Sequence, residues 1–167
     1  MPELTPGERL QPCLLDRLTD ERRDLSVESG DMRVVSLSRY RRGVLRDIAW
    51  LLNARAHLQD EDICEFEHVA ASVLNFGLPD SYGQVATKQS VSDIEQRIME
   101  AIQRFEPRIL PETVHVEAKD GGEDSAGFAV VFEIFGDLWA QPACAALHIK
   151  TSLDLETGHT DDFSGDL

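Results

Sequence analysis

An acid and a base flank a proline in the stretch FEPRIL, residues 105–110. The residue before a proline is driven toward extended conformations. Side chains two residues apart in an extended segment point the same way, so Glu106 and Arg108 are expected to project side by side from a rigid corner at Pro107. The pair could tie this corner to its own domain, or it could present an acid and a base to a partner. An exposed ion pair is worth only about 0–1 kcal/mol, so chemistry alone leaves both interpretations open.

The other residues that could do chemistry favour no enzyme class. The sequence contains no phosphate-binding glycine loop, no nucleophile elbow, no zinc-protease motif and no CxxC pair. Glycoside hydrolysis needs two carboxylates with separated pKa values. The candidates for it stand out only because acids are numerous: Glu95, Glu100, Glu106 and Glu112. We therefore expect no catalytic residue, no metal site and no cofactor.

Composition restricts the partners and the compartment. The chain has 167 residues and a formal net charge of −15, with 31 acids against 16 bases. General nucleic-acid binding needs a surplus of Lys and Arg, and so does binding to anionic membranes. Three widely spaced cysteines argue against a disulfide framework. No apolar run approaches the ~20 residues that span a bilayer, and the N-terminus lacks the features of a signal peptide. We expect a cytoplasmic protein that neither binds nucleic acid nor inserts into a membrane.

The first long helix is predicted at about 37–58, with Ser36 or Ser38 as its N-cap. Its apolar stripe follows the helical period in Leu37, Val44, Leu45, Ile48, Leu51 and Leu52. At about 100° per residue, a second set aligns on the opposite face: Arg39, Arg42, Arg46, Trp50 and Asn53. Charged helix faces are normally just solvated, whereas Arg and Trp are enriched at binding hot spots. This basic strip is therefore either a solvated face or a partner surface.

Two further helices are predicted before the chain changes period. A short one is expected to end at Gly77, with Pro79 beyond it as a stop signal. Its apolar residues are Phe66, Val69, Ala70, Val73 and Leu74. A longer one is expected to start at a cap formed by Ser90 or Ser92 and to stop at Pro107. Its stripe contains Val91, Ile94, Ile98, Ala101, Ile102 and Phe105.

After Pro107 the apolar period changes from 3.6 to 2. TVHVEAK, 113–119, alternates, and FAVVFEIF, 128–135, is apolar on both faces except at Glu133, which is typical of a central strand covered on both sides. In the following long strand Leu147, Ile149 and Leu153 alternate with polar residues, which predicts a half-buried strand at an edge of the sheet. Helices first and strands later predict an α+β fold, with about three helices followed by a small, mainly antiparallel sheet of three to four strands.

One apolar cluster interrupts a polar N-terminal arm. In CLLDRL, 13–18, Leu14, Leu15 and Leu18 share one face of a short helix. The cluster could pack on its own domain, or it could fold onto a partner. Spacing alone leaves the two open.

Five stretches, in order along the chain, resemble the TssE family of type VI secretion baseplate subunits and the related wedge proteins of contractile phage tails. They are CLLDRL (13–18), RDIAWLLNAR (46–55), SVLNFGLPD (72–80), FEPRI (105–109) and SLDLETG (152–158). The sequence departs from the family pattern at Ala54, where threonine is usual, at Phe76, where tyrosine is common, and at 81–83. None of these departures touches the Glu-Pro-Arg signature.

The resemblance implies a non-enzymatic role in linking the baseplate wedge to the contractile sheath and in starting sheath polymerisation. It implies docking on a wedge bundle of TssF and TssG, possibly with TssK, through Glu106, Pro107 and Arg108 and through the N-terminal element with its Asp16. By analogy with the interlocking domain of the sheath, a strand from the sheath proteins TssB and TssC would add to the edge at Leu147, Ile149 and Leu153. The expected location is the bacterial cytoplasm, in a membrane-associated baseplate assembly.

With this resemblance, the chain divides into an N-terminal arm (1–31) with a short docking element, a single baseplate-wedge-type domain (32–158) and an acidic tail (159–167). Two alternatives remain. One is a peptidoglycan hydrolase, a lysozyme-like activity for which the carboxylates give no independent support. The other is a regulatory adaptor that uses the strip of Arg39, Arg42, Arg46 and Trp50.

Overall fold

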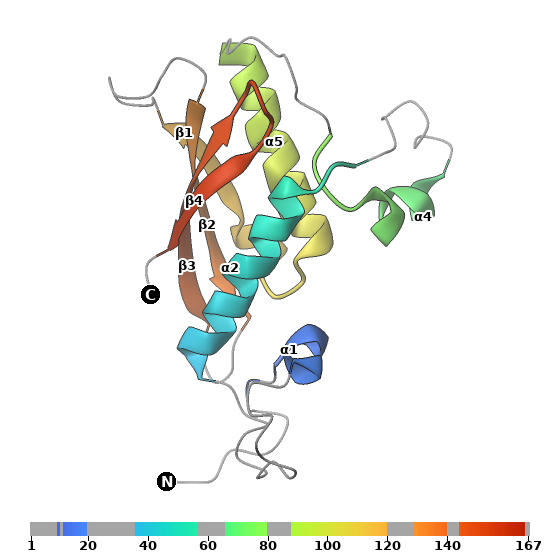
Figure 1. The fold of residues 1–167 in the computed structure, drawn as a ribbon, viewed down its shortest axis with the longest axis vertical. Helices are drawn as coiled ribbons and strands as arrows, with labels where there is room; N and C mark the ends of the chain where they lie inside the picture. Colours follow the sequence, from blue (N-terminus) through green and yellow to red (C-terminus); the bar gives the residue numbers. More distant parts are fainter. Residues whose placement is uncertain are drawn as a thin grey trace, which may run out of the picture.

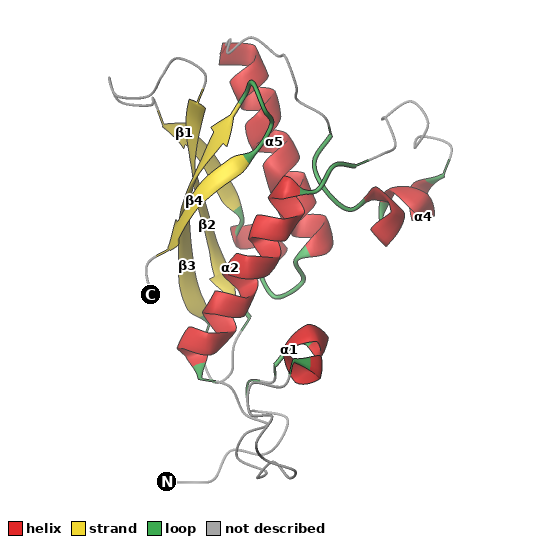
Figure 2. Ribbon diagram, viewed as in Figure 1, coloured by secondary structure: helices red, strands yellow, loops and turns green. Residues whose placement is uncertain are grey.

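Two long helices lie against one face of a four-stranded antiparallel sheet (Figure 1). The computed structural model describes residues 10, 12–19, 36–56, 66–79, 88–119, 129–139 and 144–165. Figure 2 shows the two layers, helices on one side and strands on the other. The predicted α+β fold, helices before strands, is confirmed. Most of the arm at 1–31 lies outside the described residues.

Helix α2, Leu37–Asn53, begins where Ser36 caps it by accepting a hydrogen bond from the Arg39 amide at 3.3 Å. It ends at Asn53, earlier than the predicted residue 58. The reason is tertiary: Ala54 and Ala56 exchange backbone hydrogen bonds with Leu78, at 2.9 Å each. These bonds hold the chain in an extended conformation after the helix.

Helix α5, Lys88–Phe105, is the other covering helix and contains the predicted apolar stripe. It starts earlier than expected, so Ser90 and Ser92 lie within the helix and the prediction that one of them caps it is wrong. The chain leaves the helix at Pro107, as predicted, and a 3-10 turn at Pro111–Thr113 leads into the sheet.

The predicted middle helix is broken into two short pieces, α4 (Glu67–Ala70) and a 3-10 turn at Val73–Asn75. Ser72 separates them because its hydroxyl donates to Val69 O and accepts from the Leu74 amide. The consequence is exposure: Phe66, Val73 and Leu74, expected to form an apolar stripe, are 59%, 84% and 69% exposed.

The sheet runs in the order β1 (His115–Lys119), β2 (Ala129–Leu138), β3 (Ala145–Asp154) and β4 (Thr160–Gly165). β2 is internal, as predicted. Helices cover only one of its faces among the described residues; on the other face, side chains such as Phe135 and His148 stack on each other, with ring centroids 4.6 Å apart.

Two predictions about the end of the chain are wrong. β3 is internal where β4 pairs with it, from Ile149 to Leu153, so Ile149 and Leu153 do not lie on an edge; Leu147 lies beyond the described pairing with β4. These three side chains alternate as predicted, but they are only 3%, 0% and 2% exposed beneath the helices. The segment expected to be a loose tail instead forms β4 from Thr160 to Gly165.

The core lies between the two helices and the inner face of the sheet. Val44, Ile48, Ile98 and Ile102 from the helices and Phe132 from β2 are completely buried. Burial of a large aliphatic or aromatic side chain contributes about 1.5–3 kcal/mol. The helical and strand periods therefore place one continuous apolar layer in the centre. Among the described residues, one charged side chain is buried, Glu106 of the candidate site.

Candidate partner-binding site

Glu106 and Arg108 form a bidentate ion pair at the corner after α5. Arg108 donates from Nε to Glu106 Oε1 at 2.6 Å and from Nη2 to Glu106 Oε2 at 2.5 Å. Both side chains lie on the same side of the corner, as predicted, but the predicted extended segment is wrong: residues 107 and 108 form a turn, in which the Ile109 amide donates to Glu106 O at 3.2 Å. Glu106 is only 4% exposed, however, whereas Pro107 between them is exposed. The carboxylate is thus part of the interior and is not presented to solvent.

The pair continues into a chain of alternating charges. Arg108 Nη2 also donates to Asp47 Oδ2 of α2 at 2.6 Å, and the other carboxylate oxygen of Asp47 accepts from Arg46 Nε at 2.9 Å. Arg46 Nη1 in turn donates to Asp16 Oδ1 of α1, Leu14–Leu18, at 2.6 Å. We call these five side chains, from Glu106 to Asp16, the charge network.

The charge network fastens α1 to α2 by its polar side. Cys13, just before α1, donates from Sγ to Asp16 Oδ2 at 3.0 Å and accepts from Arg46 Nη2 at 3.5 Å. None of the residues of α1 is buried. The structure therefore attaches the N-terminal element to its own domain through an aspartate, and not through its leucines.

Gly43 makes room for this arrangement in the middle of α2. A Cβ at this position would lie 3.3 Å from Asp16 Oδ2 and 3.9 Å from Arg108 Nη1. A glycine inside a helix costs about 1 kcal/mol relative to alanine. Glycine is nevertheless suited to position 43, because the absence of a Cβ lets the Asp16 carboxylate approach α2 closely.

The electrostatics of the network favour its charged forms. Burial raises the pKa of Asp16, but the hydrogen bonds from Cys13 and Arg46 outweigh it and hold that pKa below its ordinary value. Burial likewise lowers the pKa of Arg108, and the bonds to Glu106 and Asp47 more than reverse the effect. Desolvation raises the pKa of the neighbouring Tyr40, whose hydroxyl donates to Trp139 O. The pKa shifts of Asp16 and Arg108 therefore both favour the charged forms of these two groups.

Large apolar side chains point outward around this charged centre. On α1, Leu14 and Leu18 are 72% and 74% exposed, and Leu15 is 41% exposed. Trp50 is 52% exposed, with the Arg46 guanidinium 5.1 Å from its ring centroid. Trp139 is also 52% exposed, and its amide donates to Arg108 O at 2.8 Å. We call these five side chains the apolar rim.

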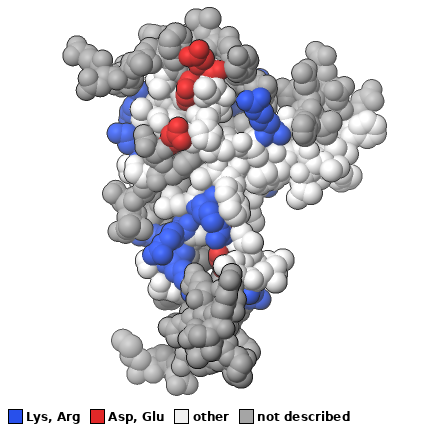
Figure 3. Space-filling view, in the orientation of Figure 1, with Lys and Arg blue, Asp and Glu red and all other residues white. Residues whose placement is uncertain are grey.

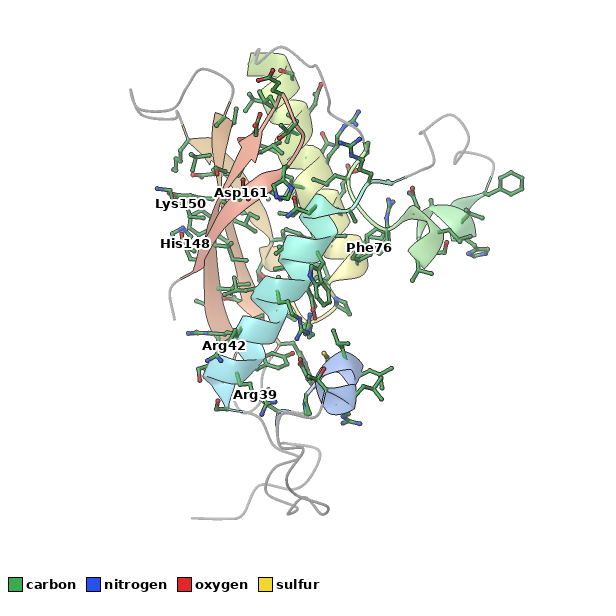
Figure 4. All side chains as sticks on the ribbon, viewed as in Figure 1. Arg39, Arg42, Phe76, His148, Lys150 and Asp161 are labelled. Carbon is green, nitrogen blue, oxygen red and sulfur yellow. The ribbon has the colours of Figure 1, made fainter. Side chains whose placement is uncertain are left out.

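The basic strip predicted on α2 is divided between two roles. Arg46 belongs to the charge network and stacks on Trp50, whereas Arg39 and Arg42 lie exposed near the start of the helix (Figure 4). Figure 3 shows Lys and Arg side chains at the surface over the lower half of α2. The structure thus joins the Glu-Pro-Arg corner, the N-terminal element and part of the basic strip into one site, which the sequence presented as three separate features.

Sequence reasoning missed Asp47, Gly43 and Trp139. Asp47 follows Arg46 directly, and neighbours in a helix do not face each other, so spacing gave no reason to connect them. Gly43 did carry a signal, since an isolated glycine within a helical pattern often marks a close approach. Trp139 lay in a connection without a periodic pattern.

The site has the chemistry of a binding surface. Its acids are neutralised by arginines, so none is placed as a free general acid or base. The described residues contain no group of three or more His, Cys, Asp and Glu side chains that could hold a metal ion. Within the described part of the chain, no helix is both long and apolar enough to cross a membrane.

Comparison with known proteins identifies the family. The model of the family described as "Baseplate wedge protein gp25" matches residues 38–143, a range that includes all but the first residue of α2, the whole of α5 and the Glu-Pro-Arg corner. Searches of the curated proteins and of the solved structures find no match. Because the match covers more than half of the 167 residues, the chain belongs to the baseplate wedge protein gp25 family, a structural family of phage-tail-like baseplates.

Proposed function

We propose that this chain is a non-enzymatic baseplate subunit of a type VI secretion system that links the wedge to the contractile sheath and helps start sheath polymerisation. The family supports the baseplate role. The proposed partners are TssF and TssG, possibly TssK, on the wedge side, and TssB and TssC on the sheath side. The proposed location is the bacterial cytoplasm, in a baseplate assembly at the membrane.

The observation that carries the wedge contact is the outward direction of the apolar rim. A short helix normally buries its leucines against its own domain, but α1 turns its aspartate toward the domain and exposes its leucines. Exposed tryptophans beside arginines have the composition of binding hot spots. We infer that the charge network acts as an internal brace and that the apolar rim contacts the wedge.

This assignment separates direct contacts from support. Glu106 and Arg108 were predicted to bind the wedge, and in this proposal they do so indirectly, since Glu106 is 4% exposed and pairs with Arg108, which in turn donates to Asp47. Leu14, Leu15 and Leu18 contact the partner themselves. Asp16 fixes the orientation in which α1 presents them.

The test is co-purification of the full-length chain with TssF and TssG. The double variant Leu14→Asp/Leu18→Asp should lose at least tenfold in wedge affinity, since burial of each leucine is worth about 1.5–3 kcal/mol. Its melting temperature should stay that of the wild type, because neither leucine is buried in the free chain. Leu74→Asp is the matched control, a leucine of similar exposure at a distant turn. Wild-type wedge binding by the double variant would contradict the proposal.

A further inference from the structure

A helix side chain occupies the outer edge of β1. The β1 strand pairs only with β2 in the described sheet, and the Ala118 amide on its outer side donates to Glu95 Oε1 of α5 at 2.6 Å. Backbone groups two residues apart on a strand point to the same side, so Val116 also directs its N–H and C=O outward. Glu95 therefore satisfies one of the backbone groups that an added strand would pair with.

The opposite edge is closed more firmly. The Asn53 side chain at the end of α2 accepts from the Thr160 amide at 2.9 Å and donates to Thr160 O at 3.0 Å, as a neighbouring strand would do. β4 also shifts its register against β3 between Lys150 and Ser152, and such irregularities blunt an edge. Where β3 extends past its described pairing with β4, Arg41 Nη2 donates to Ala146 O at 3.0 Å.

The two edges differ in how readily they can open. Glu95 holds β1 by one hydrogen bond, and its half-buried carboxylate can turn into solvent, which leaves the half-buried Ala118 amide to pair with an incoming strand. Asn53 holds β4 by two bonds to the backbone and by a third to Ala49 O within its own helix. β1 also pairs with β2 in an unbroken register, so the backbone groups on its outer side are regularly spaced for an added strand.

We propose that the outer edge of β1 is the edge that accepts a strand, and that Glu95 is a displaceable plug that keeps this edge closed in the free subunit. The inference rests on the proposed sheath-linking function and assigns the site of that contact. The edge β4, closed by Asn53, is not used. The plug also keeps β1 of one copy from pairing with β1 of another before assembly, which is the general hazard of an open edge.

The chemistry of the edge specifies the partner. Val116 and Ala118 face inward toward α5, so the added strand carries apolar residues at alternate positions to extend the core. The released Glu95 carboxylate favours a Lys or Arg on the added strand as its new partner. A strand with a basic residue also suits a chain of net charge −15.

The experiment measures binding and hydrogen exchange with purified TssB–TssC sheath protein. Sheath protein should slow exchange in the peptide that spans β1 and leave the β4 peptide unchanged. Glu95→Ala should bind sheath protein about tenfold more tightly, because the incoming strand no longer displaces a charged hydrogen bond. Glu95→Gln keeps an acceptor oxygen and should bind like the wild type.

Two controls make the result decisive. Glu100→Ala makes the same change on the same helix, at an exposed position that bonds only Gln96, and should alter nothing. Asn53→Ala should not tighten binding. Protection of β4 in place of β1, or no gain for Glu95→Ala, overturns the edge assignment and leaves the proposed function standing. Absence of sheath binding by both the wild type and Glu95→Ala overturns both.

Discussion

Replacing Arg108 with alanine tests whether the charge network is a structural brace. The substitution removes three hydrogen bonds that the Arg108 guanidinium donates to carboxylates, two to Glu106 and one to Asp47. It leaves Glu106, 4% exposed, without its cation. Removal of one partner from a buried ion pair costs about 3–5 kcal/mol. Because the Arg108 and Asp47 side chains are 19% and 25% exposed, water can reach the site and we lower the expected cost to roughly 2–4 kcal/mol.

The assay is urea unfolding at neutral pH, with the free energy of unfolding extrapolated linearly to water. In a domain of this size a loss of 2–4 kcal/mol corresponds to a fall in melting temperature of roughly 5–15 °C. Arg104→Ala is the matched control, because Arg104 is an exposed arginine near the end of α5 whose guanidinium donates to Ala70 O at 3.3 Å. It should change stability by less than about 1 kcal/mol.

A double-mutant cycle separates the pair from its surroundings. Glu106→Ala and Arg108→Ala together should cost less than the sum of the single changes, since each single variant leaves an unpaired charge. If the free energy of unfolding of Arg108→Ala lies within about 0.5 kcal/mol of the wild-type value, with an unchanged dependence on urea concentration, the network is not a brace. In that case the two side chains would be free to act directly on a partner.

Three further predictions follow from single contacts. Because the pKa of Asp16 is lowered in the folded chain, its contribution to α1 docking is complete above the unfolded pKa, about 4, and is lost as the pH falls through the lower folded pKa. Hydrogen exchange of the α1 amides should therefore rise only as the pH falls through that folded pKa. Asp16→Asn should remove this pH dependence. Gly77→Ala should destabilise the domain by at least about 2 kcal/mol in thermal unfolding, because φ is 126° and the added Cβ would lie 2.4 Å from Ala54 O; an unchanged melting temperature would refute this. Asn53→Ala should cost about 1–2 kcal/mol and expose the Thr160 amide to exchange, whereas Asn53→Asp should keep that amide protected.

Local rules account for the parts of the fold that the sequence predicted. The helical period of Val44 and Ile48 and the strand period of Leu147 and Ile149 placed these residues in the core correctly. Ser36 and Pro107 marked helix ends because capping and ring sterics act within a few residues. These features need only neighbours along the chain.

Other elements could not be predicted because distant segments decide them. The α2 helix ends at Asn53 since Ala54 pairs with Leu78, and β3 is internal since residues beyond 159 fold back on it as β4. The apolar period of α2 does not specify that Leu78 pairs with Ala54, and the apolar period of β3 does not specify that β4 pairs with it. The predicted edge was wrong at Ile149 and Leu153 for this reason.

The candidate site shows the same division. The sequence by itself determined that Glu106 and Arg108 share one side of a rigid corner, because proline geometry is local. Only the tertiary structure decided that Arg108 also binds Asp47, 61 residues away, and that Arg46 reaches Asp16 across 30 residues. Ion pairing depends on distances that packing of the whole domain sets, and this is why one charged corner became a buried brace with the leucines of α1 left outside.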